Sequence, residues 1–356
     1  MSSLLTEQFN FILPNDRIAQ HSVEPRDHSR LMILDQETGE IEHKQFYNIL
    51  DELVVGDVLV FNNTKVFRAR MMGVCHEHDV EVFLLRCVSQ EVQNSKSVWQ
   101  ALIRPGKKVQ IGDVIVINDL EVFVKEKHDD GVALIDFPLD EAGVLLFTDS
   151  HGEIPIPPYV DEKPKSIEQY QTVYAKETGS VAAPTAGFHF TNELLDQIKL
   201  KGIEIVFVTL HVGIGTFRPM KTDAIDDHVM HSEFVSIPSF SANCINTAKN
   251  ERRRVVAVGT TTVRSLEGAA LMNQDGGYLS ERGFEGDINM FIKPGFQFKI
   301  IDALITNFHL PKSTLLVLVS AFAGRNHVLH AYEEAIEKGY RFFSFGDAMF
   351  IRSKKR

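Results

Sequence analysis

The stretch Val181–Pro219, which reads VAAPTAGFHFTNELLDQIKLKGIEIVFVTLHVGIGTFRP, sets the expected architecture. It contains two histidines, His189 and His211, each in a loop of small and aromatic residues. Between these loops lie a short amphipathic segment near Asn192–Lys199 and a β-branched apolar run at Ile203–Leu210. The first predicts a helix and the second a buried strand. A loop, helix, strand and loop in this order are typical of α/β proteins, which hold functional side chains on loops carried by rigid elements.

The composition bounds the class of protein. The chain has 356 residues, of which 44% are hydrophobic and 24% charged, as in an ordinary globular protein. It has neither an apolar run of about 18 residues nor a basic, then apolar, N-terminus. We therefore expect no membrane partner and a cytoplasmic location. The net charge of −11, taken alone, argues against a nucleic-acid partner. Nucleic-acid binding depends on local basic clusters, however, and the chain has several, such as Arg252–Arg254. A solvated surface would also explain these clusters.

The pattern of expected helices and strands changes twice along the chain. From Ala69 to about Phe147, short β-type runs alternate with polar turns and show no long helical period, which indicates a small all-β module. A proline-rich connector at Gly152–Tyr159 follows. Helix and strand patterns then alternate. Predicted strands are Val58–Phe61, Ile203–Leu210, Val255–Val258, Lys299–Thr306 and Arg341–Phe345, and predicted helices begin near Ser313 and Asn326. The sequence thus predicts a discontinuous α/β catalytic domain of residues 1–65 and 152–356, with an all-β domain of residues 66–151 inserted into it.

Polar clusters follow several of the predicted strands. Examples are Asn63-Thr64-Lys65, Gly259-Thr260-Thr261, Asn307-Phe308-His309 and Gly346-Asp347. Because α/β folds place active sites at shared strand ends, these clusters are expected to form one site. The glycine and threonines at 259–262 open a predicted helix, and this arrangement suits an anion or a sugar, although an ordinary capped turn would look the same.

Other site types lack their motifs. The chain has 14 histidines, but the close pairs (His76/His78, His228/His231 and His327/His330) lack a third ligand at recognisable spacing, and HExxH is absent. The cysteines Cys75, Cys87 and Cys244 form no CxxC pair, so we expect neither disulfides nor a thiolate zinc site. No GxSxG or strand-following GxGxxG occurs. We expect no metal.

Seven strings of the sequence resemble one known family. They are FNNTKV at 61–66, YQTVYAKE at 170–177, PTAGFHFT at 184–191, TLHVGIGTFRP at 209–219, VGTT at 258–261, ALITNFHLPKST at 303–314 and FGDAM at 345–349. They are similar to the S-adenosylmethionine:tRNA ribosyltransferase-isomerases of queuosine biosynthesis, over nearly the whole chain and in order. Phe188, Ile214 and Phe345 stand where Leu, Ala and Tyr are expected, which affects packing.

The resemblance implies a reaction and a fold. The ribosyl part of S-adenosylmethionine, the co-substrate, is transferred to 7-aminomethyl-7-deazaguanine at the tRNA wobble position and isomerised. The product is epoxyqueuosine-tRNA, with adenine and methionine released. The implied fold is a barrel-like α/β domain with an inserted small β-barrel, without a metal. We expect a monomer whose partners are S-adenosylmethionine and tRNA carrying the modified base.

This chemistry assigns candidate roles. A general base must remove a proton from the carbon beside the sulfonium, and an acid or hydrogen-bond donor must reach the ring nitrogens of the leaving adenine. Aromatic faces or a carboxylate should lie beside the cationic sulfonium, and arginine or lysine should bind the tRNA phosphates. The expected residues are His189 and His211 for proton transfer, with Asp347 as a further acid or base; Phe188, Phe190 and Phe217 beside the sulfonium; Thr260, Thr261 and Asn307 on ribose or adenine; Arg218, Arg264 and Lys312 on phosphate or fixing loops; and Thr191, His309, Asn63 and Arg68 elsewhere on the substrates. Core packing is the alternative for each phenylalanine, and a salt bridge, for example to Glu267, is the alternative for Arg264.

Two other classes of function remain as alternatives. A base-exchanging tRNA transglycosylase would need a nucleophilic aspartate and usually a zinc site, for which the sequence shows no cysteine-histidine cluster. A non-catalytic RNA-binding module would not need so many His, Asn, Thr and Asp residues at strand ends. Release of adenine from S-adenosylmethionine in the presence of modified-base tRNA distinguishes the three.

Overall fold

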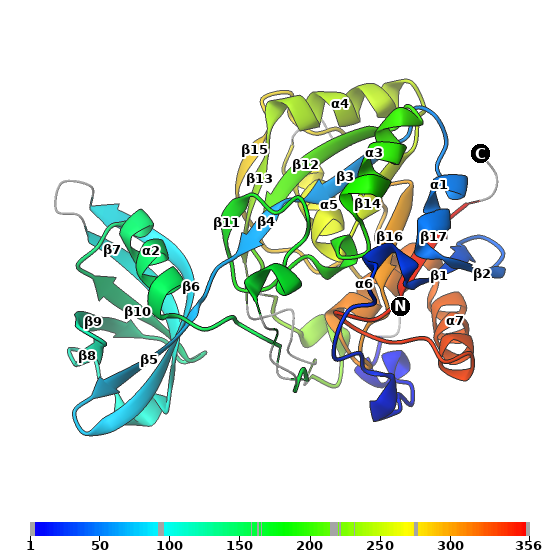
Figure 1. The fold of residues 1–356 in the computed structure, drawn as a ribbon. Helices are drawn as coiled ribbons and strands as arrows, with labels where there is room; N and C mark the ends of the chain where they lie inside the picture. Colours follow the sequence, from blue (N-terminus) through cyan, green and yellow to red (C-terminus); the bar gives the residue numbers. More distant parts are fainter. Residues whose placement is uncertain are drawn as a thin grey trace. The chain divides into compact units, whose positions relative to one another are not determined.

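Figure 1 shows a computed structural model of the chain, which describes residues 4–91, 96–157, 159–161, 164, 166–213, 220, 222–230, 232–273 and 277–353. The chain folds into two compact units. The main unit comprises Met1–Thr64, Pro158–Glu177 and Pro184–Arg356, and the β unit comprises Lys65–Pro157 and Thr178–Ala183. Beyond residues 66–151, the β unit thus takes in Lys65, most of the proline-rich connector (residues 152–157) and the later segment Thr178–Ala183.

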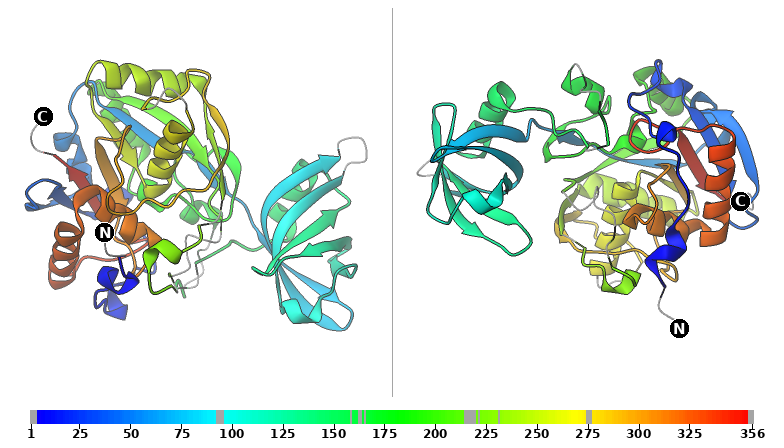
Figure 2. Two further views of the ribbon diagram at one scale, coloured as in Figure 1. Left: turned by 180° about the vertical axis from the view of Figure 1, so that it is seen from behind. Right: turned by 90° about the horizontal axis from the view of Figure 1, so that it is seen from below.

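The main unit is built on a nine-stranded mixed sheet (Figures 1 and 2). Its order is β15 (Phe284–Ile288), β13 (Glu233–Ile237), β12 (Glu204–Leu210), β3 (Val58–Asn62), β14 (Val255–Val258), β16 (Ala303–Asn307), β17 (Ala348–Arg352), β1 (Arg30–Asp35) and β2 (Ile41–Gln45). Strands β12, β3, β14 and β16 are parallel. β3, β14 and β16 are buried along their whole length, as parallel strands covered on both faces must be, and this explains their continuous apolar runs.

Helices cover the sheet. Their bounds are α1 (Ile49–Glu52), α3 (Asn192–Leu200), α4 (Ser239–Asn250), α5 (Thr260–Met272), α6 (Thr314–Ala323) and α7 (Arg325–Glu337). Apolar side chains of α1 and α3 form one core cluster with β1, β3, β14, β16 and β17, and α4 and α5 pack against β12, β3 and β14. The expected hydroxyl cap of α6 is confirmed, since Ser313 accepts a hydrogen bond from the Leu316 N–H. None of the described helices is long and apolar enough to cross a membrane.

The β unit contains a closed six-stranded barrel. Its order is β10 (Val132–Phe137), β7 (Lys96–Arg104), β6 (His78–Glu91), β5 (Arg70–Cys75), β8 (Val114–Ile117) and β9 (Leu120–Lys127). Inward-facing residues form its own core, which includes Trp99. A two-stranded ribbon of β4 (Thr64–Val66) and β11 (Glu177–Ser180) lies where the chain passes between the units. The α/β class with an inserted β-barrel is therefore confirmed.

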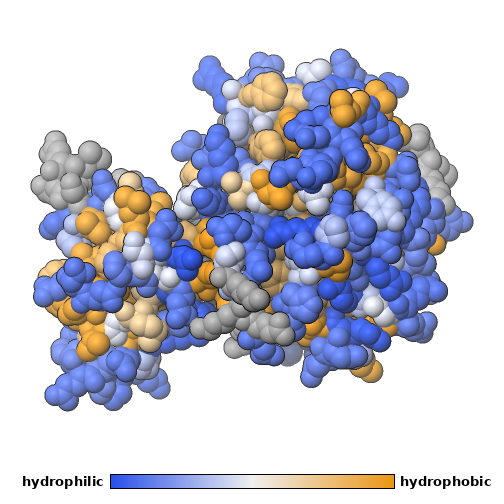
Figure 3. Space-filling model, viewed as in Figure 1, coloured by the Kyte–Doolittle hydropathy of each residue, from blue (hydrophilic) through white to orange (hydrophobic). Residues whose placement is uncertain are grey.

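The outer face of this barrel is unusually apolar over three strands (Figure 3). Met72 and Val74 on β5, Val116 on β8 and Phe123 on β9 are all exposed, and Val74 pairs directly with Val116. Grouped apolar side chains of this kind are typical of interaction surfaces.

Three expectations from the sequence differ from the structure. The β unit also contains a helix, α2 (Glu141–His151), which Asp140 caps by accepting the Gly143 N–H. The predicted strand Arg341–Phe345 is wrong: the chain turns there, with Phe343 at φ +74°, and the strand is β17 instead. The predicted strand Lys299–Thr306 begins only at Ala303, because the Glu267 carboxylate accepts the N–H groups of residues 299–301.

Candidate functional site

The polar clusters meet at one edge of the main sheet. β12, β3, β14 and β16 are parallel neighbours, so their carboxyl ends lie at the same edge. β17 begins at this edge, where Ala348 pairs with Asn307, and β1 begins beside it, where Leu31 pairs with Ala348. We call this edge the polar rim, and its residues are Ser29, Asn62, Asn63, Thr64, His211, Thr260, Thr261, Asn307 and Asp347.

His189 is tied to the rim through both ring nitrogens. Its Nδ1 lies 2.7 Å from Ser29 Oγ, and its Nε2 lies 3.1 Å from Asn307 Nδ2. Thr185 donates to the Asn307 amide oxygen at 3.4 Å, which turns the amide N–H₂ toward the histidine. Nε2 is then the acceptor, so the proton sits on Nδ1 and is donated to Ser29. The ring also stacks on Phe46, with centroids 4.9 Å apart.

The surroundings of His189 keep it neutral. Burial, followed by the positive charges of Arg341 and Arg26, lowers the pKa of His189 to about 3. Both ring nitrogens are already hydrogen-bonded, so neither offers a free lone pair. The geometry therefore favours a positioning role for this residue.

His211 has a different environment. It directly follows β12, and its Nδ1 lies 2.7 Å from Thr64 Oγ1 at the start of β4. The ring stacks on Phe234 at 5.7 Å with an interplanar angle of 17°. Burial lowers the pKa of His211 to about 4, against an opposing effect of Glu177. Its Nε2 has no hydrogen-bond partner among the described residues, so one nitrogen is fixed and the other is available to a substrate.

The start of α5 adds donors to the rim. Gly259, at φ +89°, occupies the N-cap position, so no side chain satisfies the first-turn N–H groups. Such a helix N-terminus favours an anion or a polar ligand atom. Thr261 is held in place because Asn62 Nδ2 donates to its Oγ1 at 3.3 Å.

Comparisons with known proteins identify the family. Residues 6–351 match the family model described as queuosine biosynthesis protein. The chain is 49% identical over 350 residues to the S-adenosylmethionine:tRNA ribosyltransferase-isomerase of Desulfitobacterium hafniense, covering 97% of this chain and 99% of that protein. The chain belongs to this queuosine biosynthesis family. It is thus an enzyme of the transferase class. A crystal structure of the S-adenosylmethionine tRNA ribosyltransferase from Thermotoga maritima is similar to it, with a TM-score of 0.56, 36% identity and coverage of 97% of this chain and 99% of that one.

In this member of the queuosine biosynthesis family, the Asp347 carboxylate is part of the backbone framework. Its oxygens accept the N–H groups of Arg30 at 3.0 Å and Arg341 at 2.8 Å, and the Arg341 guanidinium lies 3.6 Å away. The side chain is buried. These bonds tie the start of β1 to the turn before β17, so the structure gives Asp347 a clear structural task.

The predicted sulfonium-binding phenylalanines lie in packed surroundings. Phe190 is fully buried in the core between Phe46 and Phe61, at centroid distances of 4.9 and 4.8 Å. Phe188 is also buried, stacks on Phe345 at 5.9 Å and already has the Arg26 guanidinium 5.2 Å from its ring centroid. Phe217, together with Arg218, lies outside the described residues.

The remaining predicted residues divide between structural contacts and exposed positions. Thr191 caps α3 by accepting the Leu194 N–H. His309 is buried, bonds Thr306 at 2.9 Å, and has its pKa lowered to about 3 by burial. Lys312 forms an ion pair with Glu7 at 2.6 Å, and Arg68 is half-buried in the β unit.

Arg264 forms a buried ion pair with Glu233 rather than with Glu267. The other oxygen of Glu233 accepts the Gly213 N–H at 3.3 Å, close after His211. The alternative of an internal salt bridge was therefore correct in kind, but the partner is different. This pair links α5 and β13 to the His211 loop.

Two rim residues, Asn62 and Ser29, were missed from the sequence, and Thr64 was placed in a polar cluster without a role of its own. Asn62 directly follows a predicted strand, so its position alone could have identified it. Asn62 is fully buried and bonds both the N–H and the C=O of Leu210 at 3.0 Å. Ser29 precedes a strand that starts at the rim, and no strand-end pattern marks it.

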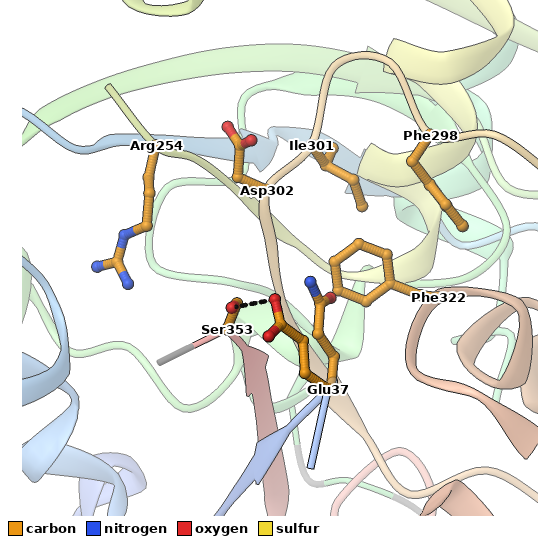
Figure 4. A pocket seen from close by; sticks show the side chains of 8 residues that line it. Glu37, Arg254, Phe298, Ile301, Asp302, Phe322 and Ser353 are labelled. Carbon is orange, nitrogen blue, oxygen red and sulfur yellow. Dashed lines mark hydrogen bonds between the residues drawn. The ribbon is translucent and has the colours of Figure 1, made fainter. Parts of the chain in front are cut away.

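A separate pocket of about 330 Å³ lies at the opposite edge of the sheet (Figure 4). Asp302 and Arg254 precede β16 and β14 there, and Phe298 and Phe322 pack edge to face at 5.0 Å. It contains none of the predicted site residues. Among the described residues, the only trio of potential metal ligands is Cys75, His76 and Asp113, in the β unit.

Proposed function

We propose that this enzyme transfers the ribosyl moiety of S-adenosylmethionine to 7-aminomethyl-7-deazaguanine at the wobble position of tRNA and isomerises it. The product is epoxyqueuosine-tRNA, and adenine and methionine are released. The names of the relatives support the use of S-adenosylmethionine and tRNA and the combined transfer and isomerisation. S-adenosylmethionine then serves as a co-substrate rather than a resident cofactor.

The observation that carries this proposal is the state of His211. A proton must leave the carbon beside the sulfonium, so the site needs a group that is unprotonated near neutral pH and has a free lone pair. His211 meets both conditions when its Nδ1 carries the proton and donates it to Thr64 Oγ1. Its pKa is lowered to about 4, and Nε2 then offers a lone pair that has no partner among the described residues. Thr64 fixes the ring through Nδ1. We assign proton abstraction to His211.

The other rim residues have supporting roles in this proposal. Asn307, Thr260, Thr261 and Asn63 supply amide and hydroxyl groups for ribose or adenine. His189 orients the Asn307 amide through its Nε2. Removal of the imidazole would leave that amide held only by the 3.4 Å bond from Thr185, which weakens substrate binding more than the proton transfer itself.

Contacts to tRNA are assigned to partly exposed cations. Lys312 is accessible and is paired only with an exposed carboxylate, and such pairs contribute about 0–1 kcal/mol, so phosphate can replace Glu7. Arg68 is the second candidate. Arg264 is buried against Glu233, so we assign it to holding the His211 loop rather than to phosphate.

The test is adenine release from S-adenosylmethionine with tRNA carrying the modified base. His211→Gln is expected to lower turnover by about 10²–10⁴-fold, the range for loss of a general base. His189→Gln is expected to raise KM with a smaller effect on kcat. His330→Gln, at an exposed histidine of α7, is the matched control and should leave both unchanged. Near-normal turnover of a folded His211→Gln variant would refute the base assignment, and no adenine release by the wild-type enzyme would refute the reaction.

A further inference from the structure

Three side chains with metal-binding groups meet at one end of the barrel. Cys75 is the last residue of β5 and is buried, His76 opens the two-residue turn to β6, and Asp113 directly precedes β8. Asp113 Oδ1 lies 3.2 Å from His76 Nε2, and Asp113 Oδ2 lies 3.7 Å from Cys75 Sγ. All three ligand atoms lie within 4.8 Å of one another. Asp113 is 38 positions from Cys75 in the chain, so no spacing motif could reveal this trio.

Two of the separations are close to those of ligands around one zinc ion. Zinc bonds are about 2.3 Å to sulfur, about 2.0–2.1 Å to imidazole nitrogen and about 2.0–2.2 Å to carboxylate oxygen. In a tetrahedral site, two such ligand atoms are therefore roughly 3.3–3.6 Å apart. The distances of 3.2 and 3.7 Å, which involve the two different oxygens of Asp113, are close to these values, and the third separation is within 4.8 Å, so side-chain rotation would have to complete the site.

The backbone at His76 is an independent indication. Its φ is +55°, a left-handed conformation that glycine and asparagine adopt more easily in a two-residue hairpin turn. In this turn the imidazole lies beside Asp113, although the side chain is 65% exposed. Residues held in such conformations often serve a function. The carboxylate of Asp113 is oriented in turn by the Gln110 N–H at 2.7 Å, as expected of a supported ligand.

We propose that Cys75, His76 and Asp113 bind one Zn²⁺ in the β unit, with water as the fourth ligand. Sulfur and imidazole ligands favour zinc over magnesium or calcium. A thiolate, a carboxylate and a neutral imidazole balance the charge of the divalent ion. The exposed imidazole leaves a route for the ion to enter. The site would stabilise the β5–β6 turn against the start of β8.

The test uses the full chain, freed of metal by dialysis against a chelator and titrated with Co²⁺ and then Zn²⁺. Cobalt is expected to give a thiolate-to-metal charge-transfer band that saturates at one equivalent and disappears when zinc is added. Trp99 is the only tryptophan and lies in the barrel core, so its fluorescence reports unfolding of this unit. Zinc should raise the Trp99 unfolding temperature by about 4 °C or more.

Two ligand variants and two controls separate this site from others. His76→Asn keeps a residue that tolerates the turn and removes the imidazole, and Cys75→Ser removes the thiolate. Both should lose the cobalt band and the zinc-dependent shift, while Cys87→Ser and His78→Gln should keep them. The proposal is overturned if the wild-type chain shows no thiolate band, or if the band survives in folded His76→Asn. A zinc shift that is equal in all variants would likewise overturn it, since it would come from metal bound elsewhere.

Discussion

Replacement of Asn62 by alanine should destabilise the main unit more than any other single change at the rim. The Asn62 side chain makes four hydrogen bonds: two with the Leu210 backbone at 3.0 Å, one from the Thr64 N–H at 3.1 Å and one to Thr261 at 3.3 Å. At about 1 kcal/mol each, their loss costs roughly 4 kcal/mol, because the buried partners are left without water to replace them. Leu210 and Thr64 also position His211, so adenine release should fall as well.

Urea unfolding followed by far-UV circular dichroism measures this effect. With a slope of roughly 3 kcal/mol per molar urea, the midpoint of the main transition should fall by about 1 M or more. Asn63→Ala is the matched control, since its side chain is half-buried and accepts one bond from Thr209 at 2.7 Å, worth about 1 kcal/mol. Trp99 fluorescence should shift less than the circular dichroism signal, because that residue lies in the separate core of the β unit. Equal midpoints for the Asn62 and Asn63 variants would refute the reasoning.

Two further predictions concern buried charge. Burial lowers the pKa of His189 and His309 to about 3 and that of His211 to about 4, whereas an unfolded histidine titrates near 6.5. The unfolded chain therefore binds protons first, and stability present above about pH 6.5 should be lost as pH falls toward 4, by up to about 1.4 kcal/mol per pH unit for each histidine; urea midpoints at pH 7, 6 and 5 that rise with acidity would contradict this. Arg264→Met should cost roughly 3–5 kcal/mol, because it leaves Glu233 buried without its cation, and Arg264→Met with Glu233→Gln should recover much of the loss in the same assay. A double variant no more stable than the single one would show that the pair is not the cause.

The fold was predictable wherever the strands are buried on both faces. The runs Val58–Phe61 and Val255–Val258 are short, β-branched and apolar, and the structure has strands at both. The same rule failed at Arg341–Phe345, where the aromatic side chains are also buried. There the backbone turns, since Asp347 accepts the Arg341 N–H and Phe343 donates its N–H to Phe308. An apolar run reports burial, and it does not report the direction of the backbone.

The sequence predicted which polar residues lie at the rim, but it did not predict the hydrogen-bond partners of those residues. Polar residues after parallel strands share an edge in any α/β sheet, which is why Asn307 and His211 could be assigned to one site. Ser29, which bonds His189 from 160 positions away, carries no local signal. The choice between the adjacent Asn62 and Asn63 depends on which side chain points inward, and a one-residue difference in strand register reverses it.

The two histidines of Val181–Pro219 look equivalent in the sequence, and the structure separates them by their lone pairs. A general base must offer a free lone pair when the substrate arrives. His189 Nε2 already accepts from Asn307, so proton abstraction there would first break a buried hydrogen bond and then create a cation near Arg341 and Arg26. His211 has no such obstacle, because Thr64 binds the opposite nitrogen and Glu177 favours the protonated form. The same ring therefore supports substrate positioning in one loop and proton transfer in the other.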